Sequence, residues 1–436
     1  MKRVLLIGNG AREHVLAETF KRSPRGCELA VFAKAMNPKI AEMAAAYEQG
    51  DLDDADAIVA FARDFAADFV CVGPENPLAD GIVDALAEAG IPSASPMATV
   101  ARLESSKSFT RDLLRKHGIA GNPEFRVFES EEGLREYLEE LGEYVVKADG
   151  LMGGKGVKLS GEHLHSLDEG VAYAVDCVEK QGHVVVEEKF VGQEFSLMSF
   201  SDGENIADMP AVQDHKRAYE GDTGPNTGGM GTWSDADHSL PFLRADDVRE
   251  AHEITQATVR ALEAETGVKF VGIMYGGFIA TRKGVRLIEY NARFGDPEAM
   301  NVLPLLKSDL IEICERMIDG TLDEMEIEFE RKATVVKYVV PKGYPDAPVK
   351  GEKIEVGEVP EGVKAYYASV DQREDGLYLS GSRAIAFVGI ADTVAEAEKL
   401  AQSAVSSVSG PVFYRPDIGT AELIQVRIDH MAELRG

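Results

Sequence analysis

The sequence predicts an α/β protein of 436 residues with three domains. Residues 1–101 alternate short apolar runs with stretches of helical periodicity, the pattern of a parallel sheet built from βαβ units. Residues 102–325 mix helices with hairpins, which predicts two α+β lobes, the smaller one at about 122–190. Residues 326–436 are strand-rich before one helix, which predicts a small α+β domain. A chain of this length has room for two to four domains of about 100 to 200 residues each.

The first domain is expected to be Rossmann-like. Its apolar runs and helical stretches are, in order, KRVLLI, REHVLAETFKR, ELAVFA, DADAIVAFARDFAA, DFVCVG and PLADGIVDALAEAG. Each short apolar run is followed by a turn and then by an amphipathic stretch. This order places the turns at the carboxyl ends of the strands, where open α/β sheets bind ligands.

The first turn, GNGARE, resembles a dinucleotide-binding fingerprint but differs from it at two points. Glu13 stands where a third glycine would allow close helix packing, and the second strand ends in Ala33-Lys34 rather than in an acid for a ribose diol. These differences argue against a nicotinamide cofactor. Backbone amides at this helix N-terminus, with Arg12 and His14 nearby, still suit a phosphate group. The turn Gly73-Pro74-Glu75 is either a second ligand loop or only a proline-stiffened helix start.

The segment VVKADGLMGGKGV predicts a phosphate-binding hairpin. A β-branched run carries Lys147, and the glycine-rich loop that follows carries Lys155. Glycines at 150, 153, 154 and 156 let backbone amides turn inward, and two ammonium groups add charge. The segment is not a Walker A motif, because no Ser or Thr follows Lys155. The alternative is a hairpin whose lysines are only solvated.

The next two segments predict the rest of a nucleotide or substrate site. HVVVEEKFV is an apolar strand that ends in Glu187, Glu188 and Lys189; it offers main-chain groups to an adenine edge, with Glu194 for ribose hydroxyls, or it is an ordinary edge strand. QDHKRAYEGDTGPNTGGMG, residues 213–231, shows neither a helical nor a strand period. We expect it to be a long loop that lines the substrate site, because long loops inside domains are usually functional or disordered.

Residues 270–291 predict two strands joined at Arg282-Lys283-Gly284. Glu289 and Asn291 are two residues apart, so on a strand they face the same way. A carboxylate and an amide oxygen presented together suit Mg²⁺, which also takes oxygens from water and phosphates. The alternative for Glu289 is a strand-end salt bridge. ARFGDPE then adds Arg293 and Asp296 before a helix that Pro297 can begin.

The C-terminal residues 326–436 show strands ATVVKYVV, KAYYASV and SRAIAFVGI, followed by the helix VAEAEKLAQSAVSSV. Thr393 and Glu396 predict a capping box at the start of this helix. No catalytic group of residues is evident in this part of the sequence.

Composition excludes several classes of partner. The 75 acidic and 46 basic residues give a formal charge of −29, which opposes binding to nucleic acid or to an anionic membrane and suits a salt-rich cytoplasm. The four cysteines are scattered singly, so neither a disulfide framework nor a zinc site is expected. No apolar run approaches the roughly 20 residues of a membrane span, and MKRVLLIGNG is too short for a signal peptide. We expect a cytoplasmic monomer.

Taken in order, these motifs resemble the ATP-grasp superfamily and, within it, the glycinamide ribonucleotide synthetase family (phosphoribosylamine–glycine ligases). The resemblance rests on IGNGAREH, VGPENPLADGIVD, LESSKSFTRDLL, VVKADGLMGGKGV, QDHKRAYEGDTGPNTGGMG and IEYNARFGDPE, and it runs nearly end to end. DHKR followed by DTGPNTGGMG is its most specific part. The central domain is accordingly identified as an ATP-grasp domain.

The resemblance implies an ATP-dependent ligation of glycine to 5-phosphoribosylamine that gives glycinamide ribonucleotide, ADP and phosphate, the second step of de novo purine biosynthesis. Its implied cofactors are ATP as cosubstrate and Mg²⁺ or Mn²⁺. Transfer of the γ-phosphoryl group to the glycine carboxylate would make a glycyl phosphate, which the ribosylamine nitrogen then attacks. Such catalysis depends on positioning and charge neutralisation and needs no protein nucleophile.

The resemblance also implies roles for particular residues. Contacts with ATP are implied for Lys107, Lys147, Gly153, Gly154, Lys155, Glu187, Glu188, Lys189, Phe190, Val191 and Glu194. Contacts with glycine or the ribosyl phosphate are implied for Asn9, Gly10, Arg12, Gly73, Pro74, Glu75, Asp214, Lys216, Arg217, Asn226 and Arg293. Metal ligation is implied for Glu289 and Asn291, and a catalytic role for Lys155, Arg293, Asp296 and Asp214.

The sequence departs from the family pattern at several positions. Ala11 replaces a usual glycine, Met152-Gly153 stands where two alanines are common, and Tyr367-Ala368-Ser369 lacks a His-Ala-Gly pattern. Residues 270–281 contain no acid, although many ATP-grasp enzymes carry a metal ligand on the strand before Glu-x-Asn.

Three other functions remain open. A ligase or carboxylase with another acceptor is opposed by the 213–231 segment. A noncatalytic nucleotide sensor is opposed by intact Lys147, Lys155, Glu289 and Asn291. A Rossmann oxidoreductase is opposed by Glu13 and Lys34.

Overall fold

A parallel sheet forms the N-terminal part of the protein, as the sequence predicted. The structure is a computed structural model that describes residues 1–152 and 156–436, so the predicted loop residues Gly153, Gly154 and Lys155 lie outside it. Its first four strands are parallel in the order β3-β2-β1-β4. The elements are β1 (Lys2–Ile7), α1 (Ala11–Lys21), β2 (Cys27–Ala33), α2 (Pro38–Met43), β3 (Ala46–Gln49), α3 (Ala55–Phe65), β4 (Phe69–Val72), α4 (Glu75–Ala79) and α5 (Ile82–Glu88).

Glu13 explains the altered turn between β1 and α1. Its carboxylate accepts a hydrogen bond from the Gly10 N–H at 2.6 Å and caps the helix. A Cβ at Gly73 would lie 2.0 Å from Glu13 Oε1, so the second turn has to carry a glycine there. Glu13 therefore fills the space between the two predicted ligand turns.

The smaller lobe is an antiparallel sheet with two covering helices. Its strand order is β5-β8-β6-β7, and β6 and β7 form the predicted lysine hairpin. Two helices, α6 (Ala98–Ser105) and α7 (Lys107–Lys116), lead into it. The elements of the lobe are β5 (Phe125–Phe128), α8 (Leu134–Leu141), β6 (Tyr144–Ala148), β7 (Val157–Leu159), α9 (Leu167–Gln181) and β8 (Val184–Glu188).

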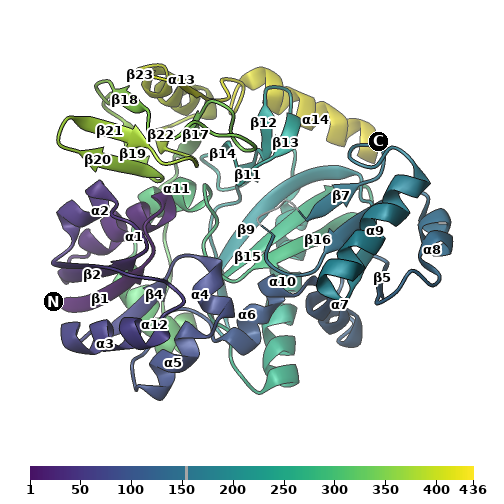
Figure 1. Ribbon diagram of the computed structural model, residues 1–436, viewed down its shortest axis with the longest axis horizontal. Coiled ribbons are helices and arrows are strands. Elements are labelled where there is room, and N and C mark those ends of the chain that lie inside the picture. Colours follow the sequence, from purple (N-terminus) through teal and green to yellow (C-terminus); the bar gives the residue numbers. More distant parts are fainter. Residues whose placement is uncertain (153–155) are drawn as a thin grey trace.

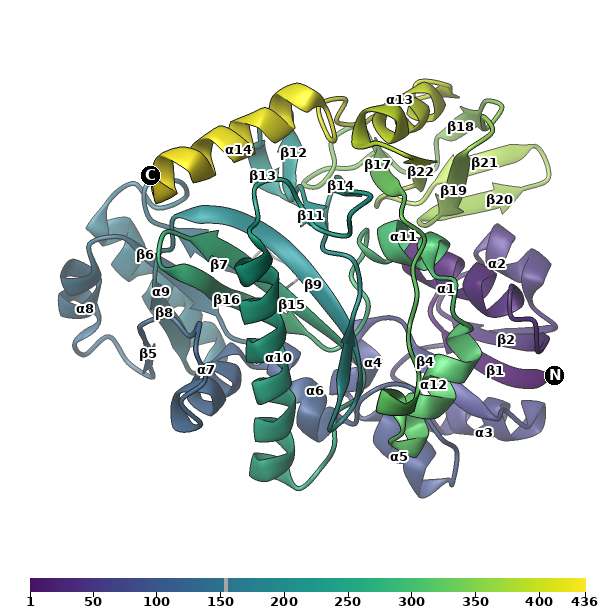
Figure 2. The same ribbon diagram turned by 180° about the vertical axis from the view of Figure 1, so that it is seen from behind.

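A long curved sheet occupies the centre of the molecule (Figure 1). Its antiparallel order is β10-β9-β15-β16, and the helix α10 packs along it (Figure 2). The elements are β9 (Gly192–Asp202), β10 (Ile206–Asp208), α10 (Ala245–Thr266), β15 (Val271–Thr281), β16 (Gly284–Asn291), α11 (Ala299–Val302), α12 (Leu310–Asp319) and the 3-10 turns Leu303–Leu305 and Leu322–Glu324. The helix that Pro297 was expected to begin starts two residues later.

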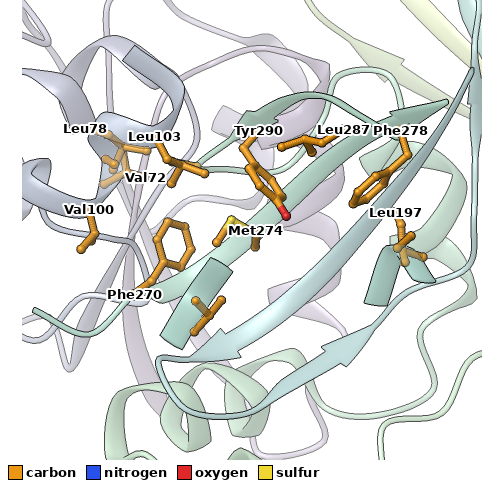
Figure 3. Close-up of a cluster of buried hydrophobic side chains, with 14 of the residues drawn as sticks. Val72, Leu78, Val100, Leu103, Leu197, Phe270, Met274, Phe278, Leu287 and Tyr290 are labelled. Carbon is orange, nitrogen blue, oxygen red and sulfur yellow. The ribbon is translucent and has the colours of Figure 1, made fainter. Parts of the chain in front are cut away.

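One hydrophobic core joins the central sheet to the N-terminal part. Val72 and Leu78 lie on one side of this cluster, and Leu287 and Phe278 of the central sheet lie on the other, with Met274 between them (Figure 3). All five side chains are buried. Burial of apolar surface at about 25 cal/mol per Å² stabilises this contact, so the ligand turns are held against the central sheet.

Strands from the middle and the end of the chain share a third sheet. β14 pairs with β17, so residues on both sides of position 325 belong to it, and the predicted boundary there stays a prediction. The order is β11-β14-β17-β22-β19, with β24 also on β17, and a separate ribbon pairs β12 with β13. These strands are β11 (Gln213–Asp214), β12 (Arg217–Tyr219), β13 (Thr223–Asn226), β14 (Gly231–Ser234), β17 (Ala333–Pro341), β19 (Val363–Tyr367), β22 (Ile385–Ala391) and β24 (Val412–Phe413).

The expectation of a loop without strands at residues 213–231 was therefore wrong. Its strands are only two to four residues long, too short to produce a sequence period. A second C-terminal sheet has the order β20-β21-β18-β23. The remaining elements are β18 (Lys353–Val356), β20 (Val370–Arg373), β21 (Gly376–Leu379), α13 (Val394–Val405), β23 (Val408–Ser409) and α14 (Ala421–Arg435). Thr393 caps α13 as predicted. No helix in the described part of the chain is long and apolar enough to cross a membrane.

The C-terminal strand β19 packs on the N-terminal helix α1. The Tyr367 N–H donates to His14 Nδ1 at 2.8 Å, and the Tyr366 hydroxyl donates to Glu18 at 2.5 Å. The Lys364 ammonium also pairs with Glu18. The segment around Tyr367, which departs from the family pattern, thus joins the C-terminal part of the fold to the N-terminal helix α1.

This contact predicts a pH-dependent stability. Burial lowers the pKa of His14 to about 4, so the folded protein holds it neutral. Between pH 6.5 and 4 the unfolded chain binds a proton that the folded chain does not, so the free energy of unfolding falls as the pH falls. We expect this residue to remove about 2 kcal/mol between pH 7 and pH 5. In urea unfolding at both pH values, His14→Gln should flatten the dependence, and an unchanged difference would contradict the prediction.

Candidate active site

Two adjoining cavities lie where the three parts of the fold meet. The first cavity, of about 390 Å³, lies between the N-terminal turns, β16 and the 213–231 segment, and the second, of about 380 Å³, lies between β8, β9 and the β12–β13 ribbon. Both volumes are in the range of small-molecule sites, about 300 to 1,000 Å³. The cavities share lining residues, namely Val157, Asp214, Lys216, Thr227, Ile288 and Glu289.

The strand β16 carries the predicted metal pair. Glu289 and Asn291 both line the first cavity, and Glu289 Oε1 lies 3.4 Å from Lys216 Nζ. Burial would raise the pKa of Glu289, but the charges of Lys216, Lys147 and Lys107 lower it to about 2, so the carboxylate is ionised. An ionised carboxylate beside an amide oxygen fits a hard divalent cation.

The neighbouring strand places no acid beside this pair. Gly277 of β15 is the cross-strand partner of Glu289. Among the described residues, no group of three His, Cys, Asp or Glu side chains could hold a metal. A cation here would therefore take its further ligands from water or from phosphate oxygens, which is usual for Mg²⁺.

A buried ion network fixes Lys147 behind the second cavity. Its ammonium lies 2.8 Å from Glu187 Oε2 and donates to the Ile288 carbonyl at 2.9 Å. Arg111 binds the same carboxylate through Nε at 2.6 Å and through a terminal nitrogen at 3.0 Å. Burial acts to raise the pKa of Glu187, but the two cations hold it below its usual value. Glu187 lines the cavity, yet its carboxylate is already bound by protein groups.

Asp149 attaches the lysine hairpin to the start of α7. Its carboxylate accepts hydrogen bonds from the Lys107 N–H and the Ser108 hydroxyl at 2.5 Å each, and it contacts His183 Nε2 at 2.7 Å. The Lys107 ammonium donates to the Gly150 carbonyl at 2.8 Å. Lys107 lines the first cavity, beside Gly150 and Gly156 at the two ends of the loop.

Acidic side chains hold two arginines of the first cavity. Arg293 lies 2.9 Å from Glu104 and 3.4 Å from Glu75. Burial opposes the charge of Arg293, but the two carboxylates outweigh it and raise the pKa of its guanidinium. Arg12 bonds to Glu13 at 2.6 Å and donates to the Phe294 carbonyl at 3.2 Å. Glu104, on α6, was missed by the sequence reasoning.

A third arginine reaches this cavity from the C-terminal part. Arg383 precedes β22 and donates to the carbonyls of Gly228, Gly229 and Asp296 at 2.6, 3.1 and 3.0 Å. It also lies 3.1 Å from Asp296 Oδ2. No catalytic group was evident in the C-terminal part of the sequence, but the structure brings Arg383 from it to the first cavity, where it ties two segments of the cavity wall together.

Asp214 and Glu298 are two more acids of the first cavity. Asp214 Oδ1 is buried and has no hydrogen-bond partner among the described residues. Burial, followed by the charge of Glu298, raises the pKa of Asp214. Glu298 accepts hydrogen bonds from the Tyr275 hydroxyl at 2.8 Å and from Ser196 at 3.1 Å. Two carboxylates at such a position favour a cationic ligand group between or beside them.

The wall of the second cavity follows the end of β8. The chain leaves the strand at Lys189, whose ammonium lies 3.4 Å from Glu162 and donates to the Ser160 carbonyl. Phe190, Gln193 and Glu194 complete this wall. A main chain beside an apolar ring suits a flat heterocycle, and Glu194 suits hydroxyl groups.

The structure brings most of the predicted residues to the two cavities. Arg12, Pro74, Glu75, Lys107, Asn291, Arg293 and Asp296 line the first one. Lys147, Glu187, Glu188, Lys189, Phe190, Glu194, Arg217 and Asn226 line the second one, so the last two lie with the expected nucleotide residues rather than the substrate residues. The residues that line neither are Asn9, Gly10, Gly73 and Val191.

Models of one family match most of the chain. The family described as phosphoribosylglycinamide synthetase matches with its N domain at residues 2–104, its ATP-grasp (A) domain at residues 105–299 and its C domain at residues 334–421.

Curated relatives are similar over the whole length. A phosphoribosylamine–glycine ligase of Methanosarcina acetivorans is 49% identical over 100% of this chain and 98% of its own length. A protein of the same name from Pyrococcus furiosus is 46% identical over 100% of this chain and 98% of its own.

Solved structures share the fold. A phosphoribosylamine–glycine ligase of Thermotoga maritima superposes with a TM-score of 0.79 at 27% identity, covering 95% of this chain and 99% of that one. The biotin carboxylase domain of a 2-oxoglutarate carboxylase of Hydrogenobacter thermophilus, in complex with MgADP, ADP and bicarbonate, has a TM-score of 0.69 at 17% identity, covering 99% of this chain and 94% of that one. The predicted fold, a parallel-sheet domain followed by an ATP-grasp domain and a C-terminal domain, is confirmed.

Proposed function

The chain belongs to the phosphoribosylglycinamide synthetase family and is a phosphoribosylamine–glycine ligase of purine biosynthesis, and we propose that it activates glycine as a glycyl phosphate. ATP is cleaved to ADP and phosphate. In the proposed first step the β–γ bond of ATP breaks and the γ-phosphoryl group joins the glycine carboxylate. In the second step the amine of 5-phosphoribosylamine attacks the acyl carbon, phosphate leaves, and the nitrogen loses a proton. The product is glycinamide ribonucleotide.

The observation that supports this scheme is the Glu289–Lys216 contact at the junction of the two cavities. We place the adenine at Lys189 and Phe190 in the second cavity, the ribose at Glu194, and the phosphates toward Lys147 and Lys107. Phosphoryl transfer is catalysed mainly by positioning and by neutralising charge, and the cations near Glu289 provide both.

Glu289 and Asn291 are the residues that would hold Mg²⁺ or Mn²⁺. When bound, such an ion neutralises charge on the phosphate oxygens. The ionised state of Glu289 and the oxygen donors of the pair fit either ion.

The first cavity is the proposed place of glycine and of the ribosyl substrate. The unpartnered oxygen of Asp214, close to Glu298, suits the glycine ammonium. Arg293 and Arg383 suit the carboxylate and the transferring phosphoryl group, and Arg12 and Glu75 suit the phosphoribosyl end. We also propose that the protein works as a monomer in the cytoplasm.

An omission assay tests the scheme. Phosphate release is measured with ATP, Mg²⁺, glycine and freshly made phosphoribosylamine, and each component is left out in turn. We expect release to stop without glycine or ATP and to fall strongly without the amine. Oxygen-18 in the glycine carboxylate should appear in the released phosphate. Release that is indifferent to glycine, or phosphate without the label, would contradict the proposal.

A further inference from the structure

The C-terminal helix α14 lies along the outer side of the second cavity. Both ribbon views place it beside the β12–β13 ribbon and above the central sheet (Figures 1 and 2). All but its first residue lie beyond the residues 334–421 that the family's C domain matches. The helix carries Arg427, which lines the second cavity.

Three side chains of the helix make polar contacts with the rest of the fold. Arg435 binds Asp247 through two hydrogen bonds of 2.7 Å and donates to the Thr281 carbonyl at 3.1 Å. His430 Nδ1 lies 2.6 Å from Gln193 Nε2. Arg427 pairs with Asp222 of the ribbon turn. Only the contact of Arg427 reaches the ribbon.

Asp222, in the turn between β12 and β13, contacts several basic side chains. Besides Arg427, it accepts a hydrogen bond from Arg415 at 2.8 Å and lies 3.3 Å from His215 Nδ1. Arg415 also donates to the Arg217 carbonyl at 3.1 Å, and its neighbour Asp417 accepts from the Gly221 N–H at 2.9 Å. Two arginines from the last part of the chain therefore hold both sides of this turn.

A buried lysine secures the segment that carries Arg415. Lys337 of β17 is fully buried and donates to the Pro416 carbonyl at 2.7 Å, to Glu398 at 2.6 Å and to Gln402 at 2.8 Å. The contacts of Arg415 are thus fixed from within the C-terminal sheet. Arg427, on the exposed helix, is the second and outer support of Asp222.

The ribbon and the residue before it carry two cationic side chains, Lys216 and Arg217, that line the second cavity. Lys216, just before β12, lies 3.4 Å from Glu289, and Arg217 donates to Glu162 of the smaller lobe at 2.8 Å. A shift of the ribbon turn would move both side chains. Misplacement of a charge by about 1 Å is enough to weaken binding or catalysis strongly.

We propose that Arg427 is a positioning residue of the nucleotide site. Through Asp222 it fixes the β12–β13 ribbon and so places Lys216 and Arg217 in the wall of the second cavity. This inference rests on the proposed assignment of that cavity to ATP. It gives the C-terminal helix a function in nucleotide binding.

The test compares Arg427→Gln, Arg427→Lys and Arg435→Gln in the full chain. ADP binding in the presence of Mg²⁺ is measured by calorimetry, and unfolding temperature is measured for each variant. Losing one charge-assisted contact should raise the ADP dissociation constant on the order of tenfold in Arg427→Gln. Arg427→Lys keeps the charge and should bind ADP more tightly than the glutamine variant.

Arg435→Gln is the matched control. It loosens the same helix at its other end, so its unfolding temperature should fall while its ADP affinity stays within twofold of the parent protein. Equal loss of ADP affinity in Arg435→Gln and Arg427→Gln, or parental affinity in Arg427→Gln, would overturn the inference. If Arg427→Gln does not fold, an ADP affinity lower in Arg427→Lys than in Arg435→Gln supports the inference, and equal ADP affinities in these two variants overturn it. ADP binding is measured without glycine, so this test is independent of the proposed reaction. If the parent protein binds ADP but releases phosphate without glycine in the omission assay, the result counts against the proposed reaction and not against the role of Arg427.

Discussion

Replacement of Glu289 by alanine should lower the turnover number at least about 10³-fold while leaving the fold intact. The residue supplies the ionised carboxylate of the Glu-x-Asn pair and faces the Lys216 ammonium at 3.4 Å. Removal of one group that stabilises developing charge typically costs about 10² to 10³ in rate, and loss of a metal ligand adds to this. Phosphate release under saturating ATP, glycine and phosphoribosylamine measures the effect.

Glu250→Gln is a matched control for this experiment. The Glu250 carboxylate accepts the Val285 N–H at 2.8 Å at the other end of the same strand, β16, and it lines neither cavity. Glutamine keeps the acceptor, so turnover should stay close to that of the parent. A turnover number of Glu289→Ala close to that of the parent would contradict the prediction that Glu289 binds the metal ion.

Replacement of Glu187 by glutamine should produce the largest loss of stability. The substitution leaves Arg111 and Lys147 buried without their counter-charge, and breaking one partner of a buried ion network costs about 3 to 5 kcal/mol. Urea unfolding at pH 7, followed by far-ultraviolet circular dichroism, measures the change. We expect a clearly lower midpoint than in the parent.

The pH dependence of stability provides a second test of the role of Glu187. The pKa of Glu187 is lowered in the folded protein, against the effect of burial, by Arg111 and Lys147. Its stabilisation is therefore present above the unfolded pKa of about 4.3 and is lost as the pH falls below that value. The glutamine variant should lose this part of the acid dependence.

Glu188→Gln is the control on the neighbouring position of β8. Within residues 1–152 and 156–436, its carboxylate accepts a single hydrogen bond, from the Glu124 N–H at 2.8 Å, and glutamine can accept the same bond. An equal shift of the urea midpoint in both variants would mean that the ion network does not carry the stability assigned to it.

Local patterns in the sequence were sufficient for the strands that carry the site. Short apolar runs that alternate with helical stretches predicted the parallel sheet. The two-residue spacing of Glu289 and Asn291 predicted that both side chains face the same way, and both line the first cavity. In these cases one segment contains the whole signal. The short strands of residues 213–231 contain no such signal, because pairs of two to four residues are set by their tertiary neighbours.

Long-range partners could not be predicted from a single sequence. Glu104, Glu298 and Arg383 reach the first cavity from α6, from the turn before α11 and from the residues before β22. None stands in a spacing that marks it as a site residue. Likewise, nothing near Glu187 indicates that Arg111, on a helix, neutralises it.

The pairing of β14 with β17 also bears on how the chain folds while it is being made. β14 ends at Ser234, and its partner begins at Ala333, so the substrate segment emerges from the ribosome well before its sheet can form. Until β17 is made, the edge of β14 that faces away from β11 has no partner strand, and such edges can pair with other chains. Fast synthesis of the chain as far as Pro341, or a chaperone that covers this edge meanwhile, would limit such pairing.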